Sequence, residues 1–276
     1  MNLRDLDVYF NYHTHTNRNG HGNRTATDED YVRAAMETGI RILGFSEHCP
    51  YQGVSQPMAR PGWDVIPEYF SSLGKLKEKY RDRCEILIGF ECEYYPNHID
   101  DVRKLKEMSD YIILGQHFNT VDNPDFYCYA FRCGDEGALE YTENVLKGLD
   151  TGMYDILAHP DYFFGGTNDI DDVFVECAHR ICQKCEETKT PMEINFNGVS
   201  WHAGKNQYKQ GPHYFYPNRL FWEIACKYDI RCVIGLDAHD PDVFRRRETL
   251  FNMLSEEVDD LGLEFLTEPF LHAKER

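Results

Sequence analysis

Short apolar runs recur along the chain, and each is followed by a polar residue and then by an amphipathic stretch of helical length. The seven runs are Val8–Tyr12, Ile42–Phe45, Ile86–Phe90, Ile112–Gly115, Asp155–Ala158, Met192–Ile194 and Cys232–Leu236. Continuous apolar character is typical of strands buried on both faces, as in a parallel sheet covered by helices. The ends of the runs lie about 37 residues apart on average, which is the length of one strand–helix unit.

The stretches between the runs predict helices. Thr27 and Asp30 form a capping-box pattern before the first of them, and Gly39 can end it. The predicted helices are Tyr31–Thr38, Asp64–Tyr80, Ile99–Met108, Asp135–Asp150, Asp169–Thr188, Asn218–Tyr228 and Asp242–Leu261. Seven strand–helix units in series predict an α/β fold related to the (β/α)8 barrel, with its chemistry at the carboxyl ends of the strands.

Two stretches are predicted to be long loops on that side of the barrel, Cys49–Trp63 and Asn197–Pro217. Such loops are candidates for lids or specificity loops. Since no linker or repeat interrupts the pattern, residues 1–276 are predicted to form a single domain.

Composition and charge narrow the function. The 276 residues include 29 Lys and Arg against 47 Asp and Glu, a formal net charge of −18. Binding to extended nucleic acid or to an anionic membrane depends on basic surface, so neither partner is expected. No apolar run approaches the roughly 20 residues that cross a bilayer, and the first residues lack the pattern of a signal peptide. We expect a cytoplasmic protein, and the oligomeric state stays open.

Histidine is the informative residue, because six of the 12 histidines lie at predicted strand ends and a seventh lies close to one. The set is His13, His15, His48, Glu91, His117, His159, Asp237 and His239, with His21 nearby in the first loop. Parallel strands bring such ends to one side of the sheet. Imidazole and carboxylate ligands without thiolate suit Zn, Fe or Mn, and so many ligands suit a cluster in which a carboxylate bridges two ions.

These residues resemble the motifs of the polymerase and histidinol phosphatase (PHP) domain family. The resemblance rests on His13-Thr14-His15, His21, Ser46-Glu47-His48, Glu91, Gln116-His117, Ala158-His159-Pro160 and Asp237-Ala238-His239. The residues flanking several of these motifs are similar to the stand-alone histidinol-phosphatase branch. The family implies a distorted (β/α)7 TIM-like barrel that holds up to three divalent metal ions.

The resemblance also implies which residues share each ion. One ion is expected at His13, His15, Glu91 and Asp237, and a second at Glu91, His117 and His159. A third is expected at His21, His48 and His239. Within this set, Asp237, His239 and His159 are expected to act in catalysis.

The implied function is a metal-dependent phosphomonoesterase that hydrolyses a small phosphorylated metabolite. The first candidate is L-histidinol phosphate, an intermediate of histidine biosynthesis. Metal ions lower the pKa of bound water from 15.7 towards about 7, so a metal-bridging hydroxide can attack phosphorus at neutral pH. The ions also explain how an acidic protein accepts a phosphate dianion.

The chain departs from the histidinol-phosphatase branch at one place. After Glu193-Ile194-Asn195 that branch commonly carries an arginine that meets the substrate phosphate, whereas this chain reads Phe196-Asn197-Gly198. The candidates to replace that arginine are Lys205 and Lys209. Arg60 and His202 are further candidates for substrate binding, since both lie in the predicted long loops.

Three other functions stay open. The family includes phosphodiesterases and nucleases, so small nucleotides or oligonucleotides are an alternative substrate class. An amidohydrolase barrel also opens with His-x-His, but this chain has Glu91 where a bridging lysine is typical. The remaining alternative is a metal-binding or regulatory protein without catalytic activity.

Overall fold

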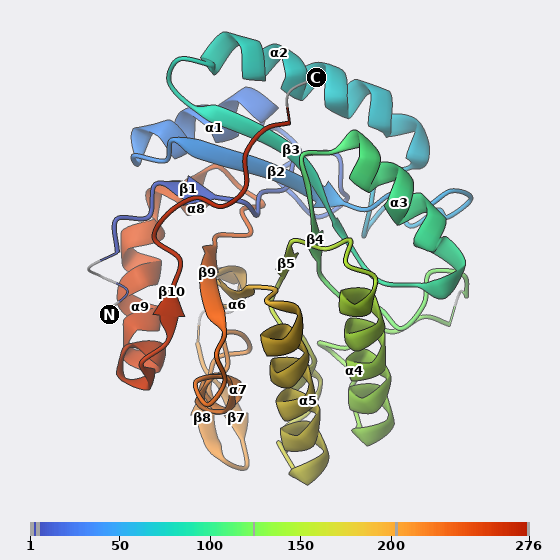
Figure 1. The fold of residues 1–276 in the computed structure, drawn as a ribbon, viewed down its shortest axis with the longest axis vertical. Coiled ribbons are helices and arrows are strands. Elements are labelled where there is room, and N and C mark those ends of the chain that lie inside the picture. Colours follow the sequence, from blue (N-terminus) through green and yellow to red (C-terminus); the bar gives the residue numbers. More distant parts are fainter. Residues whose placement is uncertain (1–2, 4–5, 124, 202–203, 275–276) are drawn as a thin grey trace.

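In the computed structural model, which describes residues 3, 6–123, 125–201 and 204–274, eight strands form one parallel sheet (Figure 1). In spatial order they are β1 (Phe10–Asn11), β2 (Ile42–His48), β3 (Glu85–Cys92), β4 (Tyr111–Leu114), β5 (Ile156–Leu157), β6 (Met192–Asn195), β9 (Arg231–Gly235) and β10 (Glu264–Phe265). Each of the seven predicted runs overlaps a strand. The predicted class, a parallel α/β fold of strand–helix units, is confirmed.

The carboxyl ends of β1 and β9 are joined beyond the regular strands. Thr14 and Ala238 form a parallel bridge, and the backbone N–H of His15 donates to the carbonyl of Ala238 at 3.0 Å. The end of the seventh predicted run therefore lies beside the end of the first. This contact brings the histidines that follow β1 next to the Asp-Ala-His motif that follows β9.

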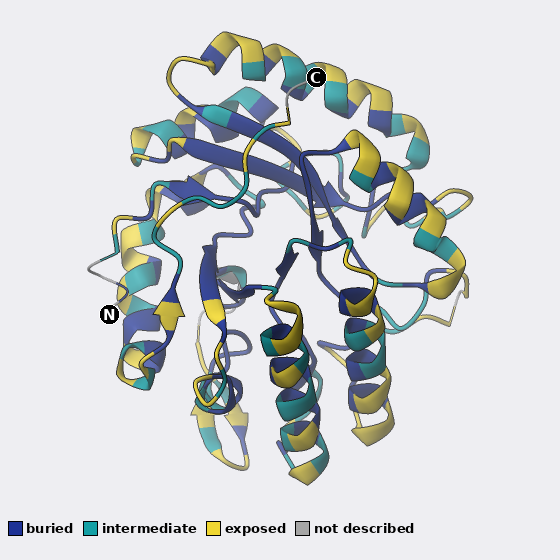
Figure 2. Cartoon of the chain, viewed as in Figure 1, coloured by how far each residue is buried: buried dark blue, intermediate teal, exposed yellow. Residues whose placement is uncertain are grey.

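Two groups of apolar residues hold the fold together. The larger group packs between the sheet and the helices, and strands are buried while the helices expose their outer faces (Figure 2). The smaller group comes from successive strands: Phe10, Tyr12, Ile42, Leu87, Tyr111, Ile113, Ile156, Ala158 and Val233. Phe270 and Leu271 of the C-terminal segment pack against it, and their backbone N–H groups donate to the Tyr12 hydroxyl.

Helices surround the strands (Figure 1). They are α1 (Asp28–Glu37), α2 (Ile66–Tyr80), α3 (Ile99–Met108), α4 (Asp135–Asp150), α5 (Asp172–Thr188), α6 (Asn197–Trp201), α7 (Arg219–Ala225), α8 (Asp242–Arg245) and α9 (Arg247–Val258). The predicted bounds of α3 and α4 are confirmed. So is the capping box of α1, in which the Thr27 hydroxyl accepts from the Asp30 N–H and the Asp30 carboxylate accepts from the Thr27 N–H.

Two predicted elements differ in kind from the structure, and one strand is not predicted. The predicted helix Asp242–Leu261 is broken at Arg246 into α8 and α9. The predicted loop Asn197–Pro217 contains α6 and an antiparallel hairpin of β7 (Asn206–Tyr208) and β8 (Gly211–His213). Strand β10 is not predicted, because it has only two residues and pairs with β9 through Glu264 and Phe265.

Within the described residues, none of the helices is both long enough and apolar enough to span a bilayer.

Candidate metal centre

The predicted ligand residues other than His21 lie where parallel strands end. His48 is the last residue of β2 and Glu91 is the last but one of β3, while His13, His15, His117, His159, Asp237 and His239 lie in the segments that follow β1, β4, β5 and β9. His21 reaches the group from the loop after β1. The sheet register sets this convergence, because His48 and Glu91 are direct partners on neighbouring strands.

Glu91 stands at the centre of the group with an exposed fraction of 1%. Its Oε1 lies 2.8 Å from Nε2 of His159 and 3.4 Å from Nε2 of His117. Its Oε2 lies 3.1 Å from Nδ1 of His48 and 3.4 Å from Nε2 of His15. The two oxygens therefore face different histidines, which is the geometry that a bridging carboxylate requires.

Close packing around Glu91 depends on a glycine. A Cβ atom added to Gly115 would lie 2.0 Å from Oε1 of Glu91. Any side chain at this position would displace the carboxylate, so the Gly-Gln-His sequence after β4 is required for the geometry of the site.

Asp237 faces the same group from the end of β9. Its Oδ1 lies 3.0 Å from Nε2 of His15 and 3.4 Å from Nε2 of His13. Its Oδ2 accepts hydrogen bonds from the side-chain amides of Asn195 and Asn197, each at 3.2 Å. One oxygen is thus held by protein amides, and the other is directed at imidazole nitrogens.

A second cluster of imidazoles lies next to this one. Nε2 of His21 lies 3.1 Å from Nε2 of both His239 and His48. The ring of His15 stacks against the rings of His48 and His239, with centroids 4.1 Å apart in each pair. His15 and His48 therefore connect the two clusters.

The backbone is strained at two residues of the site. His159 and Asp237 have φ values of 29° and 47°, in the left-handed region that non-glycine residues rarely adopt. Each such residue costs about 1–3 kcal/mol, and this strain concentrates at functional sites. Within the described residues one other non-glycine residue, Lys189, has a positive φ, and it ends α5.

The site holds more buried carboxylates than lysine or arginine side chains to pair with them. Five buried carboxylates contact its histidines: Glu47, Glu91, Glu93, Glu193 and Asp237. In the part of the chain that the structure describes, one guanidinium joins them, that of Arg60, which pairs with Glu93. Four of the five carboxylates therefore lack an arginine or lysine partner, and burying unbalanced charge is costly.

Neighbouring imidazoles keep the Glu91 carboxylate ionised. Burial alone would raise the pKa of Glu91, but His117 and His13 hold it well below its usual range. Burial and the neighbouring His15 lower the pKa of His239 to about 3, so its ring is neutral at neutral pH. Burial would also lower the pKa of His15, but the adjacent carboxylates of Asp237 and Glu47 raise it to about 9. A divalent cation would compete with that proton.

The geometry fits metal ions. Oε2 of Glu91 and Oδ1 of Asp237 are buried, and neither accepts a hydrogen bond from the described residues. Ligands about 2.0–2.1 Å from a tetrahedral ion lie roughly 3.3–3.4 Å from one another, which is close to the distances above. Four overlapping sets place three donor atoms within 4.8 Å of one another: His15, His48, His239; His13, His15, Asp237; His13, Glu91, His159; and His48, Glu91, His117.

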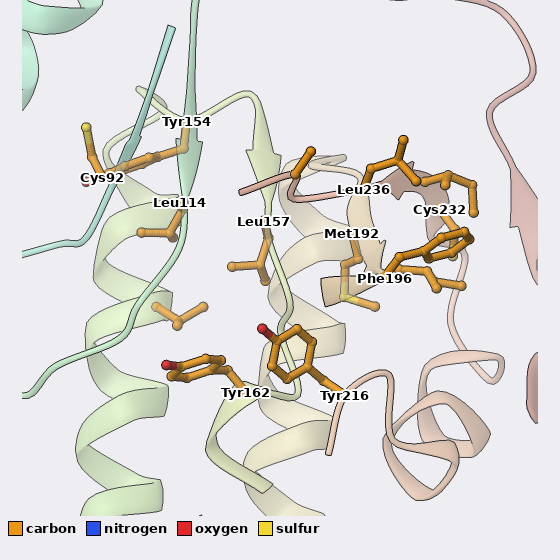
Figure 3. Packing of buried hydrophobic residues seen from close by; sticks show 14 of the residues in the cluster. Cys92, Leu114, Tyr154, Leu157, Tyr162, Met192, Phe196, Tyr216, Cys232 and Leu236 are labelled. Atoms are coloured by element: carbon orange, nitrogen blue, oxygen red, sulfur yellow. The ribbon is translucent and has the colours of Figure 1, made fainter. Parts of the chain in front are cut away.

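A cavity of about 280 Å³ opens onto the site. His21, His48, His117, Asp237 and His239 form its polar wall. The other wall is mainly apolar and consists of Met58, Ala59, Phe118, Cys128, Phe131, Tyr162, Asn197 and Tyr216. Tyr162 and Tyr216 lie side by side (Figure 3) with ring centroids 5.6 Å apart.

The predicted substrate-binding cations lie elsewhere. Arg60 is 2% exposed and makes a bidentate pair with Glu93, at 2.8 and 2.7 Å. Lys205 pairs with Glu257, and Lys209 pairs with Asp169. None of the three is among the described residues that line the cavity, and His202 lies outside the described residues.

Sequence reasoning gave no role to three glutamates that contact the ligand histidines, Glu47, Glu93 and Glu193. Each lies one or two residues from a residue already singled out, in Glu47-His48, Glu91-Cys92-Glu93 and Glu193-Ile194-Asn195. A carboxylate at a strand end beside a ligand was the available signal. Glu193 makes the shortest of these contacts, 2.8 Å from Nδ1 of His13.

Comparisons with known proteins agree with this geometry. The sequence model of the PHP domain matches residues 11–197. The chain is 26% identical to a protein of Deinococcus radiodurans named probable histidinol-phosphatase, over 95% of this chain and 96% of that one. It is 28% identical to a probable phosphatase of Clostridium acetobutylicum, over 82% and 77% of the two chains.

A solved structure has a similar fold. The histidinol phosphate phosphatase of Lactococcus lactis, complexed with zinc, L-histidinol and phosphate, superposes with a TM-score of 0.65. The match covers 94% of this chain and 95% of that one, at 17% identity. At this level of identity the likeness establishes the fold.

Proposed function

Because the chain belongs to the PHP domain family, we propose that it is a metal-dependent phosphatase of small phosphate monoesters, with L-histidinol phosphate as its first candidate substrate. The observation that carries the proposal is the position of Glu91, whose two oxygens face separate sets of histidines beside a single cavity. The zinc, histidinol and phosphate bound by the structural neighbour support the same chemistry here.

The ligand sets proposed for the metal ions are those that the family resemblance implies. One ion would be held by His13, His15, Glu91 and Asp237, whose donor atoms lie 3.0–3.5 Å apart in the contacts between imidazole and carboxylate. Glu91 would share a second ion with His117 and His159, and a third would be held by His21, His48 and His239. Two divalent cations would balance the four carboxylates that lack a basic partner, and a third would make the site positive.

Bound divalent cations would supply Lewis acidity, which activates a water molecule and neutralises phosphate oxygens. The side chains of the protein would hold these ions, and neighbouring residues orient the ligand atoms. Asn195 and Asn197 fix one oxygen of Asp237, so its other oxygen stays directed at the imidazoles. Nδ1 of His239 lies 3.0 Å from the carbonyl of Asp237, so its N–H donates there and leaves Nε2 as the ligand atom.

Asp237, His239 and His159 are the proposed catalytic residues, and they differ in access. Asp237 and His239 line the cavity. His159 is 1% exposed and packs against the rings of Tyr162 and Tyr216. Asp237 and His239 can therefore be reached by a substrate in the cavity, whereas His159 would act through Glu91.

The cavity wall favours a flat, uncharged or cationic leaving group. No lysine or arginine is among the described residues that line it, so a substrate carboxylate or second phosphate would find no basic partner. Phe118, Phe131, Tyr162 and Tyr216 offer ring surfaces that suit an imidazole. L-Histidinol phosphate meets both conditions, because it carries a ring and an ammonium group but no carboxylate.

The test is phosphate release from matched monoesters, with Zn²⁺, Mn²⁺ or Fe²⁺ added. L-Alaninol phosphate replaces the imidazole of histidinol phosphate by hydrogen, and O-phospho-D-serine, which keeps the configuration of the stereocentre, replaces the resulting methyl group by a carboxylate. We expect kcat/KM to fall about tenfold or more at the first step and to fall again at the second. Failure on every monoester would refute the proposal, and faster cleavage of bis(4-nitrophenyl) phosphate would favour the phosphodiesterase alternative.

A further inference from the structure

Glu193 on β6 is a buried carboxylate to which the proposed reaction assigns no role. It is 2% exposed. Its Oε1 and Oε2 lie 2.8 and 3.1 Å from Nδ1 of His13, and the Asn195 amide donates to Oε2 at 2.8 Å. Its carboxylate fits because residue 235 is a glycine, since a Cβ atom on Gly235 would lie 1.7 Å from Oε1 of Glu193.

The other two glutamates behind the ligands have different partners. Glu93 pairs with the Arg60 guanidinium and lies 3.5 Å from Nδ1 of His117. Glu47 accepts hydrogen bonds from Thr16, from the Asn19 amide and from the N–H of His48, and it lies 3.5 Å from Nδ1 of His15. Both carboxylates are therefore satisfied by groups other than the ligand ring.

Glu193 has one such independent partner among the described residues. Its contacts among the described residues are the neutral Asn195 amide and the His13 ring. As a carboxylate it accepts the Nδ1 proton of that ring. In the neutral ring, Nε2 of His13 is then the nitrogen without a proton, and it faces Asp237 and Glu91 at 3.4 and 3.5 Å.

We propose that Glu193 is a positioning residue for a metal ion at His13, because its hydrogen bond fixes the tautomer and the rotation of the His13 ring. Carboxylate partners of this kind orient ligand histidines, and their loss typically lowers metal affinity about 10–100-fold. The inference rests on the proposed function only in requiring that the site binds metal.

A purely structural role for Glu193 would predict that its removal lowers stability rather than metal affinity. A buried carboxylate without a basic partner gives no net stability by itself, since its desolvation is uncompensated until the ring it contacts binds a cation. The effect of removing Glu193 should therefore appear in metal binding rather than in stability.

The experiment measures Zn²⁺ binding by the full-length protein through competition with a chromophoric chelator, alongside thermal melting in excess Zn²⁺. The variants are Glu193→Gln, which keeps an acceptor but removes the charge, and Glu193→Leu, which removes both. The matched control is Glu257→Gln, another buried glutamate, which pairs with Lys205 outside the site. The visible spectrum of the Co²⁺-loaded protein reports the ligand geometry.

We expect Zn²⁺ affinity to fall about 10–100-fold in Glu193→Gln and further in Glu193→Leu, with an altered Co²⁺ spectrum. Glu257→Gln should keep wild-type affinity and spectrum even if it melts earlier. Wild-type affinity in both Glu193 variants, or an equal loss in the control, would overturn the inference. No measurement involves a phosphate ester, so a correct inference here can coexist with failure of the proposed function.

Discussion

The strand ends and the long loops of this protein behave differently as sources of functional residues. Each proposed ligand at a strand end contacts another ligand of the site, as Glu91 contacts His159. In contrast, Arg60, Lys205 and Lys209, which come from the loops, each pair with an acidic residue and lie away from the cavity lining. Sheet register fixes where a strand ends, whereas the position of a loop side chain depends on the partners it meets.

The net charge explains why the basic side chains of the loops pair with acidic residues outside the cavity. With 47 acidic residues against 29 basic ones, a lysine or arginine has many carboxylates within reach. Arg60 supports the site indirectly, since it neutralises Glu93, whose carboxylate faces Nδ1 of His117. In an acidic chain, a basic residue in a loop is therefore weak evidence for a phosphate contact.

The largest effect should come from breaking the strand-end set. His13→Ala removes a side chain whose Nε2 lies 3.1 Å from Nε2 of His15 and within 3.5 Å of both Asp237 and Glu91. We expect the variant to lose one metal ion and its phosphatase activity to fall more than about 100-fold, because loss of a ligand exceeds the typical effect of losing its supporting partner. Elemental analysis and phosphate release check this.

The control for His13→Ala is His272→Ala, in the exposed C-terminal segment, where the ring lies 3.5 Å from Glu85. It should retain the metal content and activity of the wild type. Equal metal content in the wild type and His13→Ala would refute the ligand assignment and remove the contrast between strand ends and loops.

The next largest effect is expected at Arg60, and it distinguishes a role in stability from a role in substrate binding. Arg60→Met leaves Glu93 buried without its guanidinium, and breaking a buried ion pair in this way costs about 3–5 kcal/mol. We expect a large fall in the free energy of unfolding, measured by urea denaturation in the presence of metal. Arg33→Ala, which breaks an exposed pair with Glu29, should cost less than about 1 kcal/mol. A stable Arg60→Met variant with a raised KM would instead support a phosphate contact.

Most of the fold could be predicted because it depends on local pattern. Apolar runs located the seven strands, and the bounds of α3 and α4 followed from the polar and apolar alternation between them. Strand β10 has two residues, and it exists because Glu264 and Phe265 meet the start of β9. The hairpin of β7 and β8 likewise depends on pairing between Asn206 and His213, and no periodic pattern in the sequence predicts that pairing.

The site divides in the same way. Ligands such as His48 and Glu91 could be predicted because strand ends in a parallel sheet converge. The pairing of Glu193 with His13 joins residues 180 positions apart, and the left-handed backbone of His159 and Asp237 is imposed by the surrounding structure. Such features follow from tertiary packing, and a single sequence gives no local signal for them.

A smaller effect should arise at the cavity mouth. Phe131 lines the cavity and is 62% exposed, so Phe131→Ala should leave stability nearly unchanged. Loss of one aromatic contact is worth about 0.5–1.5 kcal/mol, which predicts a KM for L-histidinol phosphate raised about 2–10-fold at similar kcat. Phe126→Ala is the matched control, since Phe126 is also partly exposed but is not among the described lining residues. A KM unchanged by Phe131→Ala would mean that this wall does not contact the leaving group.

The smallest effect is expected at Lys209, and it decides whether a loop cation meets phosphate after all. Its ammonium is well exposed and pairs with the partly exposed Asp169, so Lys209→Ala should cost less than about 1 kcal/mol and leave KM within about twofold of wild type. Lys205→Ala should cost more stability, because its partner Glu257 is buried. A tenfold rise in KM for Lys209→Ala would show that the salt bridge to Asp169 opens when substrate binds. The loop would then contribute a phosphate contact that the present position of Lys209 does not make.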